Sequence, residues 1–408
     1  MQETKLSKNI FLLVLVQFSN YIAPLLVLPY LSRTLGLNGF GTVAMAMSLC
    51  SIALIITDYG FGISAPYWLA KNKNNKKEVA SYVGAIFAVK AVLFFGCAVG
   101  VLLFLNFSDT IPNQVLIQGA ILVSVLLQTF QPNWFFLGIE KMKGVTIFMV
   151  IAKMSYLVLV FLLVKDSSDF ALVLVCFAIS NLFATSFGIF FIYKEKYWIA
   201  KPTKVQVLEV FKGGALFFVS RLAVGVYTSA STFLVGAFAG AGAAALYNSA
   251  EKLYQAGQSA TSPVSQALYP YLARTGDKQA LYKFVGISLI PLSIGVMGCI
   301  YYAEFIITLI FGAEFSAAAE LLQIFLLTLL VTFVGINFGY PAFASIGRVD
   351  IANKTVIFAA ALQLTSIAIL YILGAITAKN ICLSVLFLEI IVMLFRTTIY
   401  WFLIKGRR

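Results

Sequence analysis

The feature that most constrains this chain is a series of apolar runs of about 20 residues each, repeated along its whole length. A helix of that length crosses a hydrocarbon core of about 30 Å. The composition agrees, because 61% of the 408 residues are hydrophobic, 11% are charged, and the mean hydropathy is +0.95. A soluble globular protein carries roughly 25% charged residues. The sequence therefore predicts a polytopic membrane protein.

The runs are continuous and lack the ten-residue alternation of a membrane β-barrel, so we expect helices. The predicted spans, twelve in all, cover residues 10–31, 41–63, 80–105, 114–137, 145–164, 170–192, 212–235, 240–268, 282–310, 317–343, 351–373 and 381–404. The longest basic connection, "YKEKYWIAKPTKVQ" (193–206), divides them evenly. This predicts an all-α fold with an N-terminal bundle, residues 1–200, and a C-terminal bundle, residues 201–408, of six spans each.

Basic residues are distributed unequally between the two sides of these spans. Most fall in loops on one side, and only Arg33, Lys165 and Lys379 fall in loops on the other. Cytoplasmic loops carry the excess of Lys and Arg in membrane proteins, so both termini are predicted to be cytoplasmic. The formal net charge of +13 is mostly this asymmetry. We therefore expect contact with the lipid bilayer and no nucleic-acid partner.

Side chains that bind metals or cofactors are scarce. The sequence contains no histidine, and its five cysteines all fall in apolar runs without a C-x-x-C spacing. Histidine is the commonest metal ligand and the commonest general base. A P-loop for ATP is also missing from the sequence. We expect no metal, no cofactor and no enzymatic activity.

Several cations lie deep within the predicted spans, where a charge costs at least ~2.5–3.5 kcal/mol on insertion scales. They are Lys90, Lys153, Arg221, Lys252 and Arg396. Their excess over the deep acids indicates a hydrated, net-positive cavity that suits an anionic substrate. For any one residue, the alternative that it only joins helices by hydrogen bonds stays open.

The acidic residues of the spans have two candidate roles. Glu251 and Glu389 lie deep, whereas Asp58 lies close to the inner end of its span. Each would serve either in ion coupling or in pairing with a cation, and the sequence leaves both open. Polar residues also follow one side of the predicted span 240–268, at Asn248, Glu251, Gln255, Ser259, Ser262 and Gln266. Such a stripe faces water or another helix rather than lipid.

The stretch "QFSNYIAPLLVLPYLSRTLGLNGFG" (17–41) resembles the first-span signature of the bacterial O-antigen and polysaccharide repeat-unit flippases. These flippases belong to the multidrug/oligosaccharidyl-lipid/polysaccharide exporter superfamily. Further stretches resemble landmarks of the family in the expected order, namely "DYGFGISA" (58–65), "WFFLGIEKMK" (134–143) and "SPVSQALYPYLAR" (262–274). The stretch "SAPYWLAKN" (64–72) departs from the family pattern, so no role is assigned to that turn.

This resemblance implies a fold of two six-helix bundles in a V around a central cationic cavity. It also implies alternating-access movement of an undecaprenyl-diphosphate-linked oligosaccharide from the inner to the outer leaflet of the bacterial inner membrane, alongside other polysaccharide-assembly proteins as partners. Family members keep basic residues in the cavity. Lys90 and Lys153 match such residues by position, whereas Arg221, Lys252 and Arg396 match by depth and face only.

Three other functions remain as alternatives. An ion-coupled drug exporter of the same superfamily would have an acidic or aromatic cavity, whereas the excess here is basic. A lipid II-type flippase shares the need for cations but often has additional spans. An integral polysaccharide polymerase or glycosyltransferase would need a long outer loop with catalytic groups, and the predicted outer loops are short.

Overall fold

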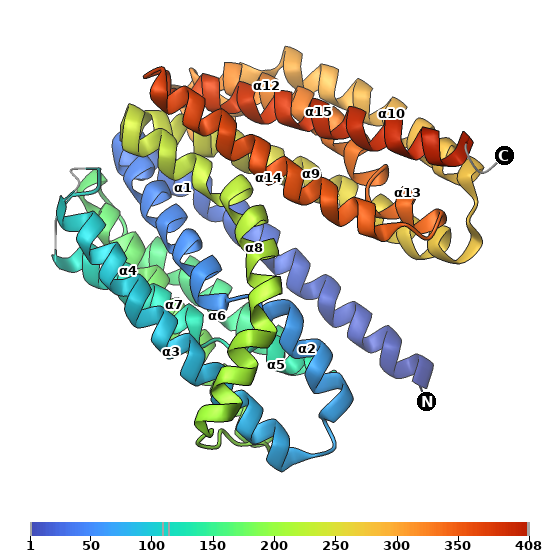
Figure 1. Cartoon of the computed structure of the whole chain (residues 1–408). Coiled ribbons are helices and arrows are strands. Elements are labelled where there is room, and N and C mark those ends of the chain that lie inside the picture. Colours follow the sequence, from blue (N-terminus) through green and yellow to red (C-terminus); the bar gives the residue numbers. More distant parts are fainter. Residues whose placement is uncertain (1, 108–109, 113–114, 406–408) are drawn as a thin grey trace. The chain divides into compact units, whose positions relative to one another are not determined.

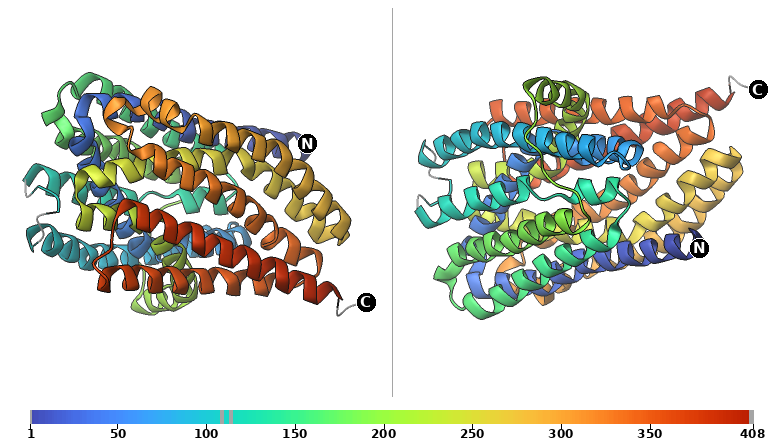
Figure 2. Two further views of the ribbon diagram at one scale, coloured as in Figure 1. Left: turned by 90° about the horizontal axis from the view of Figure 1, so that it is seen from above. Right: turned by 90° about the horizontal axis from the view of Figure 1, so that it is seen from below.

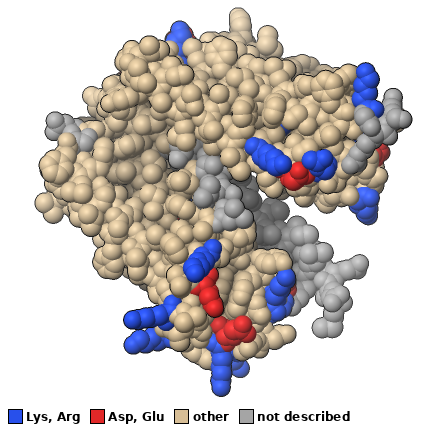
Figure 3. Space-filling view, viewed as in Figure 1, with Lys and Arg blue, Asp and Glu red and all other residues tan. Residues whose placement is uncertain are grey.

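The protein is built from helices (Figure 1). The computed structural model describes residues 2–107, 110–112 and 115–405. It describes the backbone only at residues 2–25, 142–145, 216, 219–220, 223–224, 226–229, 264 and 267. The predicted all-α class is confirmed. Figure 3 shows one face of the molecule, on which charged side chains gather in a few places between broad surfaces that carry none.

The helices before the long basic connection are these: α1 (Gln2–Asp58), α2 (Phe61–Asn72), α3 (Lys76–Phe107), α4 (Val115–Thr129), α5 (Asn133–Gly138), α6 (Met142–Leu163), the short 3₁₀ helix η1 (Ser167–Asp169) and α7 (Phe170–Lys194). The helices after it are these: α8 (Lys204–Ala239), α9 (Ala241–Thr275), α10 (Lys278–Tyr301), α11 (Ala303–Phe311), the 3₁₀ helix η2 (Ala313–Phe315), α12 (Ala318–Asn337), α13 (Tyr340–Ser345), α14 (Val349–Ile372) and α15 (Ala378–Lys405).

Contacts divide the chain into two compact units, Met1–Gly225 and Val226–Arg408, with the dividing point inside α8. In the first unit, α1 packs against α3, α4, α6 and α7, and α2 packs against α5. In the second unit, α12 packs against α9, α10 and α15, and α14 packs against α15. Figures 1 and 2 show the long helices of each unit running beside one another. The division into bundles at residue 200 stays a prediction.

Of the described residues, nine helical segments are long and apolar enough to cross a membrane. They correspond to every predicted span except the first, seventh and eighth. The first span falls mainly on residues 2–25, whose side chains lie outside the described part. The seventh falls on α8, where several side chains also lie outside it, and the eighth falls on α9, which carries the polar stripe with Glu251 and Lys252. The protein is thus a multi-pass membrane protein, and the count of twelve stays a prediction.

The 57-residue α1 comprises two helices joined at a kink at Gly36 (φ 64°), which falls between the predicted spans 10–31 and 41–63. Several predicted spans are themselves interrupted, because breaks separate α1 from α2 at Tyr59 and Gly60, α4 from α5 before Pro132, and α12 from α13 at Gly339. A break inside a membrane leaves carbonyl groups of the last helical turn without their usual partners. These groups must be satisfied by other parts of the protein.

Apolar side chains form both a core in each unit and exposed stripes along helices. In the first unit, Phe61, Trp134, Phe135, Phe136 and Phe148 are buried together. On α10, the exposed residues Ile287, Ile290, Ile294 and Met297 recur every three or four positions, which is one face of a helix. Such a continuous apolar stripe suits contact with lipid chains.

The break between α1 and α2 packs closely against α8. Tyr59 and Gly60 both have positive φ angles, 50° and 79°, and the Tyr59 ring stacks on the rings of Phe211 and Phe218 of α8 at 4.8 Å each. A Cβ atom on Gly60 would lie 2.6 Å from Phe217 Cβ and 2.8 Å from the Phe217 carbonyl carbon. The position therefore needs glycine, both for its backbone angle and for space.

We expect Gly60→Ala to destabilise the protein by about 2–4 kcal/mol, because the added methyl group meets backbone atoms and the residue is held at positive φ. The measurement is thermal unfolding of the purified protein in detergent. Gly213→Ala is the matched control, since a Cβ there meets nothing within 4 Å and alanine suits the interior of α8. Equal unfolding temperatures for the two variants would contradict the assignment.

Candidate functional site

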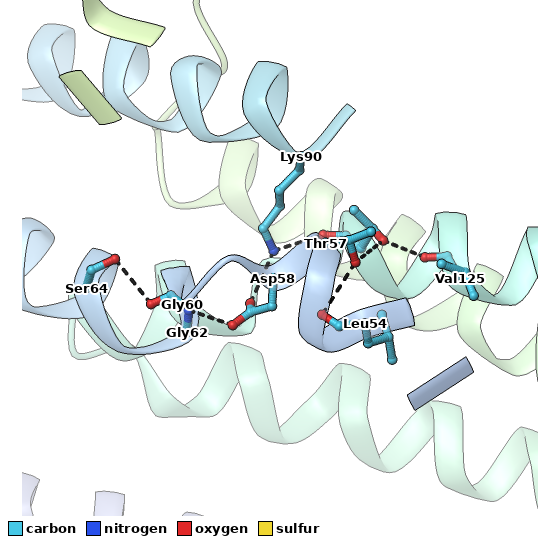
Figure 4. A network of polar contacts seen from close by, with 9 residues as sticks. Leu54, Thr57, Asp58, Gly60, Gly62, Ser64, Lys90 and Val125 are labelled. Atoms are coloured by element: carbon cyan, nitrogen blue, oxygen red, sulfur yellow. Dashed lines mark hydrogen bonds and ion pairs between the residues drawn. The ribbon is translucent and has the colours of Figure 1, made fainter. Parts of the chain in front are cut away.

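The deepest charged group of the first unit is Lys90, whose side chain leaves α3 and points at the break between α1 and α2 (Figure 4). Lys90 is 2% exposed. Its Nζ donates to the Thr129 carbonyl oxygen at 3.0 Å and lies 3.5 Å from Oδ1 of Asp58. The ammonium also lies 6.0 Å from the centre of the Trp134 ring. Protein groups therefore surround this cation and offset the cost of its burial.

The carbonyl that Lys90 contacts is free because a helix ends there. Thr129 is the last residue of α4, and Pro132 follows three positions later. Proline disfavours helical geometry in the residue before it, so the helix stops and its last carbonyls lose their partners. The Thr129 hydroxyl donates to the Val125 carbonyl at 2.7 Å and lies 2.9 Å from the hydroxyl of Thr57 on α1. This cluster ties α1, α3 and α4 together.

Asp58 has a second role besides pairing with Lys90. It is the last residue of α1, and its Oδ2 accepts a hydrogen bond from the backbone N–H of Gly62 at 3.2 Å, at the start of α2 (Figure 4). A carboxylate at a helix N-terminus is favoured by the free N–H groups and the helix dipole. The Lys90 ammonium and the Asp58 carboxylate thus satisfy backbone groups at two helix breaks. One is a carbonyl at the end of α4, and the other is an N–H at the start of α2.

Arg396 on α15 likewise satisfies a carbonyl near a helix end in the second unit. Its Nε donates to the Thr355 hydroxyl on α14 at 2.8 Å, and one terminal nitrogen donates to the Gly335 carbonyl at 2.9 Å. Gly335 lies in the last turn of α12, just before the break that precedes α13. A cation is favourable at the negative end of a helix. Arg396 therefore joins three helices and occupies a free helix end.

Sequence reasoning missed the partners of these two cations. Thr129 and Gly335 contribute backbone carbonyls, which carry no side-chain signal. Pro132 does give an indirect signal, because it predicts where α4 ends and where free carbonyls arise. The break after Gly335 has a comparable signal in Pro341, which lies in the first turn of α13, because proline is favoured at the start of a helix.

The polar stripe of α9 meets α8 at Glu251. The Thr232 hydroxyl of α8 donates to Glu251 Oε2 at 2.8 Å, and Asn248 Nδ2 lies 3.4 Å from the same hydroxyl. Lys252 turns along its own helix, where Nζ donates to Gln255 Oε1 at 3.2 Å. Glu251 and Lys252 are neighbours in sequence and interact electrostatically. This part of the second unit is a hydrogen-bonded polar region inside an apolar protein.

Glu389 and Arg396 lie two turns apart on α15 and interact electrostatically. Lys153 is half-buried in the middle of α6. Arg221 lies in the middle of α8 and is exposed, and its guanidinium makes no hydrogen bond or ion pair with the residues that the structure describes. Of the predicted site residues, Asp58 and Lys90 form an ion pair. Glu251 with Lys252 and Glu389 with Arg396 interact electrostatically, but neither pair lies within ion-pair distance. Lys153 and Arg221 lie on other helices, α6 and α8.

The described side chains form no group that would hold a metal ion. Within residues 26–107, 110–112 and 115–405, apart from the positions where only the backbone is described, no cluster of three or more Cys, Asp or Glu side chains has suitable spacing. The five cysteines are all free thiols. The polar groups described above form an ion pair, contacts with helix ends, and hydrogen bonds between side chains.

Comparison with known proteins gives a match along most of the chain. The model of the family described as "Polysaccharide biosynthesis protein" matches residues 6–276. A Shigella dysenteriae protein named "Putative O-antigen transporter" is 28% identical over 398 residues, covering 96% of this chain and 98% of its own length. An Escherichia coli K12 protein with the same name is 29% identical over 322 residues, covering 77% and 75%.

Solved structures show the same fold at low sequence identity. An inward-facing multidrug resistance transporter of the MATE family, in the MOP superfamily, superposes with a TM-score of 0.68 at 13% identity, covering 94% of this chain and 95% of its own. The lipid II flippase MurJ superposes with a TM-score of 0.69 at 12% identity, covering 94% and 87%. At these identities the likeness establishes the fold alone.

Proposed function

Because this chain belongs to the polysaccharide biosynthesis protein family, we propose that it flips an undecaprenyl-diphosphate-linked oligosaccharide, such as an O-antigen repeat unit, across the bacterial inner membrane. The chain is a membrane transporter rather than an enzyme, as the sequence predicted. The observation that carries the proposal is the match, over nearly the full length of both chains, to a protein named as an O-antigen transporter. The substrate would enter from the cytoplasmic leaflet, and both termini would face the cytoplasm.

The chemistry of the deep cations supports an anionic substrate. Arg221 is exposed in the middle of a long helix, and a guanidinium at that depth must meet water or a ligand rather than hydrocarbon. Arginine grips phosphate oxygens through two parallel N–H groups. We therefore assign the first contact with the diphosphate to Arg221. Lys153 and Lys252 would add positive charge along the path.

Lys90 and Arg396 would contribute in a different way. Both already satisfy free helix ends, and Lys90 is also neutralised in part by Asp58. Their charges would reach a substrate only if those contacts loosened as the transporter changed between states. Glu251 and Glu389 are assigned to charge pairing in preference to ion coupling, since each interacts with a neighbouring cation.

Deletion of the gene tests the proposal. We expect loss of surface polysaccharide together with build-up of lipid-linked repeat units on the cytoplasmic face, and restoration of both by a plasmid copy. A polymerase defect would instead leave single repeat units on the outer face. Normal surface polysaccharide with raised drug sensitivity would overturn the proposal in favour of a drug exporter.

A further inference from the structure

A cavity of about 670 Å³ lies in the first unit, between α1 and the end of α6. Arg33 and Lys165 both line it, together with Tyr30 and Ser167. These two cations are notable because the loops predicted to face outward carry only one further Lys or Arg, Lys379. Two of the three outward-side cations therefore line one small cavity, although 132 residues separate them (165 − 33).

Two contacts join the helices that border the cavity, α1 and α6. The Tyr30 hydroxyl donates to the Val164 carbonyl at 2.6 Å, and the Tyr30 ring lies 4.4 Å from the Phe161 ring. Lys165 directs its ammonium to the Phe161 carbonyl at the end of α6, which leaves further N–H donors for a ligand. A pocket that is already formed loses little entropy when a ligand binds.

The one acid that lines the cavity is engaged with the backbone. The Asp166 side chain accepts from the Asp169 backbone in a reciprocal cap of η1, and Asp169 Oδ2 accepts from the backbone N–H groups of Lys165 and Asp166 at 2.8 and 3.0 Å. Both carboxylates, of Asp166 and Asp169, thus accept from the backbone, whereas the lining cations Arg33 and Lys165 carry the N–H donors that an anion needs.

The walls of the cavity also change from apolar to charged in the same direction on both helices. Leu26 and Pro29 precede Arg33 by two turns and one turn of α1, and Phe161 precedes Lys165 by one turn at the end of α6. The deeper part is therefore apolar and the shallower part is basic. This order matches a lipid, with chains in the hydrocarbon and a phosphate at the surface.

We propose that this cavity binds the phosphate head group of an anionic phospholipid in the leaflet opposite the basic loops. Arg33 and Lys165 contact the phosphate, Thr34 and Ser167 offer hydroxyl groups to its glycerol part, and Leu26 and Phe161 contact an acyl chain. The site needs only the membrane setting of the chain and is independent of the transported substrate. A phospholipid fits better than a glycan-bearing lipid because the cavity is small and one wall is apolar.

The test is native mass spectrometry of the full chain in detergent with added phosphatidylglycerol. We expect the Arg33→Gln/Lys165→Gln variant to retain this lipid about 20-fold less well, as expected for two cations near an anionic head group. Lys379→Gln is the matched control, because Lys379 lies on the same predicted side but pairs with Glu320 and is not among the residues that line the cavity. Lys165→Arg should bind like the wild type. Equal losses in the double variant and in Lys379→Gln would overturn the site.

Two competitors identify the occupant. Undecaprenyl diphosphate that displaces phosphatidylglycerol at equal concentration would reassign the cavity to the polyprenyl carrier and overturn the phospholipid proposal. Inorganic phosphate that displaces it would show that the apolar wall contributes nothing, and would also overturn the proposal. Retention of phosphatidylglycerol against both, with weaker retention by Leu26→Ser, is the expected result.

Discussion

Arg221→Glu should abolish transport while leaving the protein in the membrane at wild-type levels. The change replaces a cation that would bind the diphosphate by an anion that repels it, and losing such a contact costs roughly 2–5 kcal/mol, or a rate loss of about 30-fold to about 4,000-fold. Because Arg221 is exposed and makes no bond with the described residues, we expect its replacement to leave the described contacts of the fold intact. The measurement is movement of a lipid-linked oligosaccharide across proteoliposomes, alongside immunodetection in the membrane fraction.

Two variants make this result specific. Arg221→Lys keeps the charge but loses the paired N–H donors, so we expect partial transport. Lys212→Glu makes the same charge reversal at an exposed position on α8, nearer its beginning, and should have little effect. Wild-type transport by a correctly inserted Arg221→Glu protein would refute the assignment of the first phosphate contact.

The sequence was a good guide to where the spans lie and a poor guide to where they break. Helix positions follow from the length of apolar runs, because only a helix satisfies the backbone in lipid. The run 41–63 contains the break at Tyr59 and Gly60, which depends on positive φ angles and on packing against α8. The turn between α8 and α9 was predictable, since Gly240 (φ 89°) is the single residue between the two helices.

For the site, the sequence identified the charged residues but not their partners. Lys90 and Arg396 lie deep in predicted spans, so the sequence indicated that burying their charges costs free energy. In the structure, hydrogen bonds to the helix-end carbonyls of Thr129 and Gly335 offset that cost. Pro132 indicates where α4 ends and where free carbonyls arise, but only the tertiary structure reveals which carbonyl meets which cation. The pairing of Lys90 with Asp58 was equally hidden, because the two residues lie 32 positions apart on different helices.

Asp58→Asn should be the most destabilising single change among the predicted site residues. It leaves the Lys90 ammonium 2% exposed and without a counter-charge, which costs about 3 kcal/mol at the lower end of the range for a broken buried pair. We take the lower end because the Asp58 side chain is 25% exposed. Glu140→Gln is the matched control, since it breaks the surface pair with Lys73 in the same unit and should cost no more than about 1 kcal/mol. Thermal unfolding in detergent measures both.

The double variant Asp58→Asn/Lys90→Met separates a structural pair from a substrate contact. Removing both charges leaves no buried ion without a partner, so the double variant should regain most of the stability that Asp58→Asn loses. If the pair has only a structural role at the helix breaks after α4 and before α2, the double variant should regain transport together with stability. A double variant that is stable but cannot transport would show that the Lys90 ammonium itself meets the substrate. It would also mean that Asp58 releases Lys90 during the transport cycle, because the carboxylate and the diphosphate would compete for the same cation.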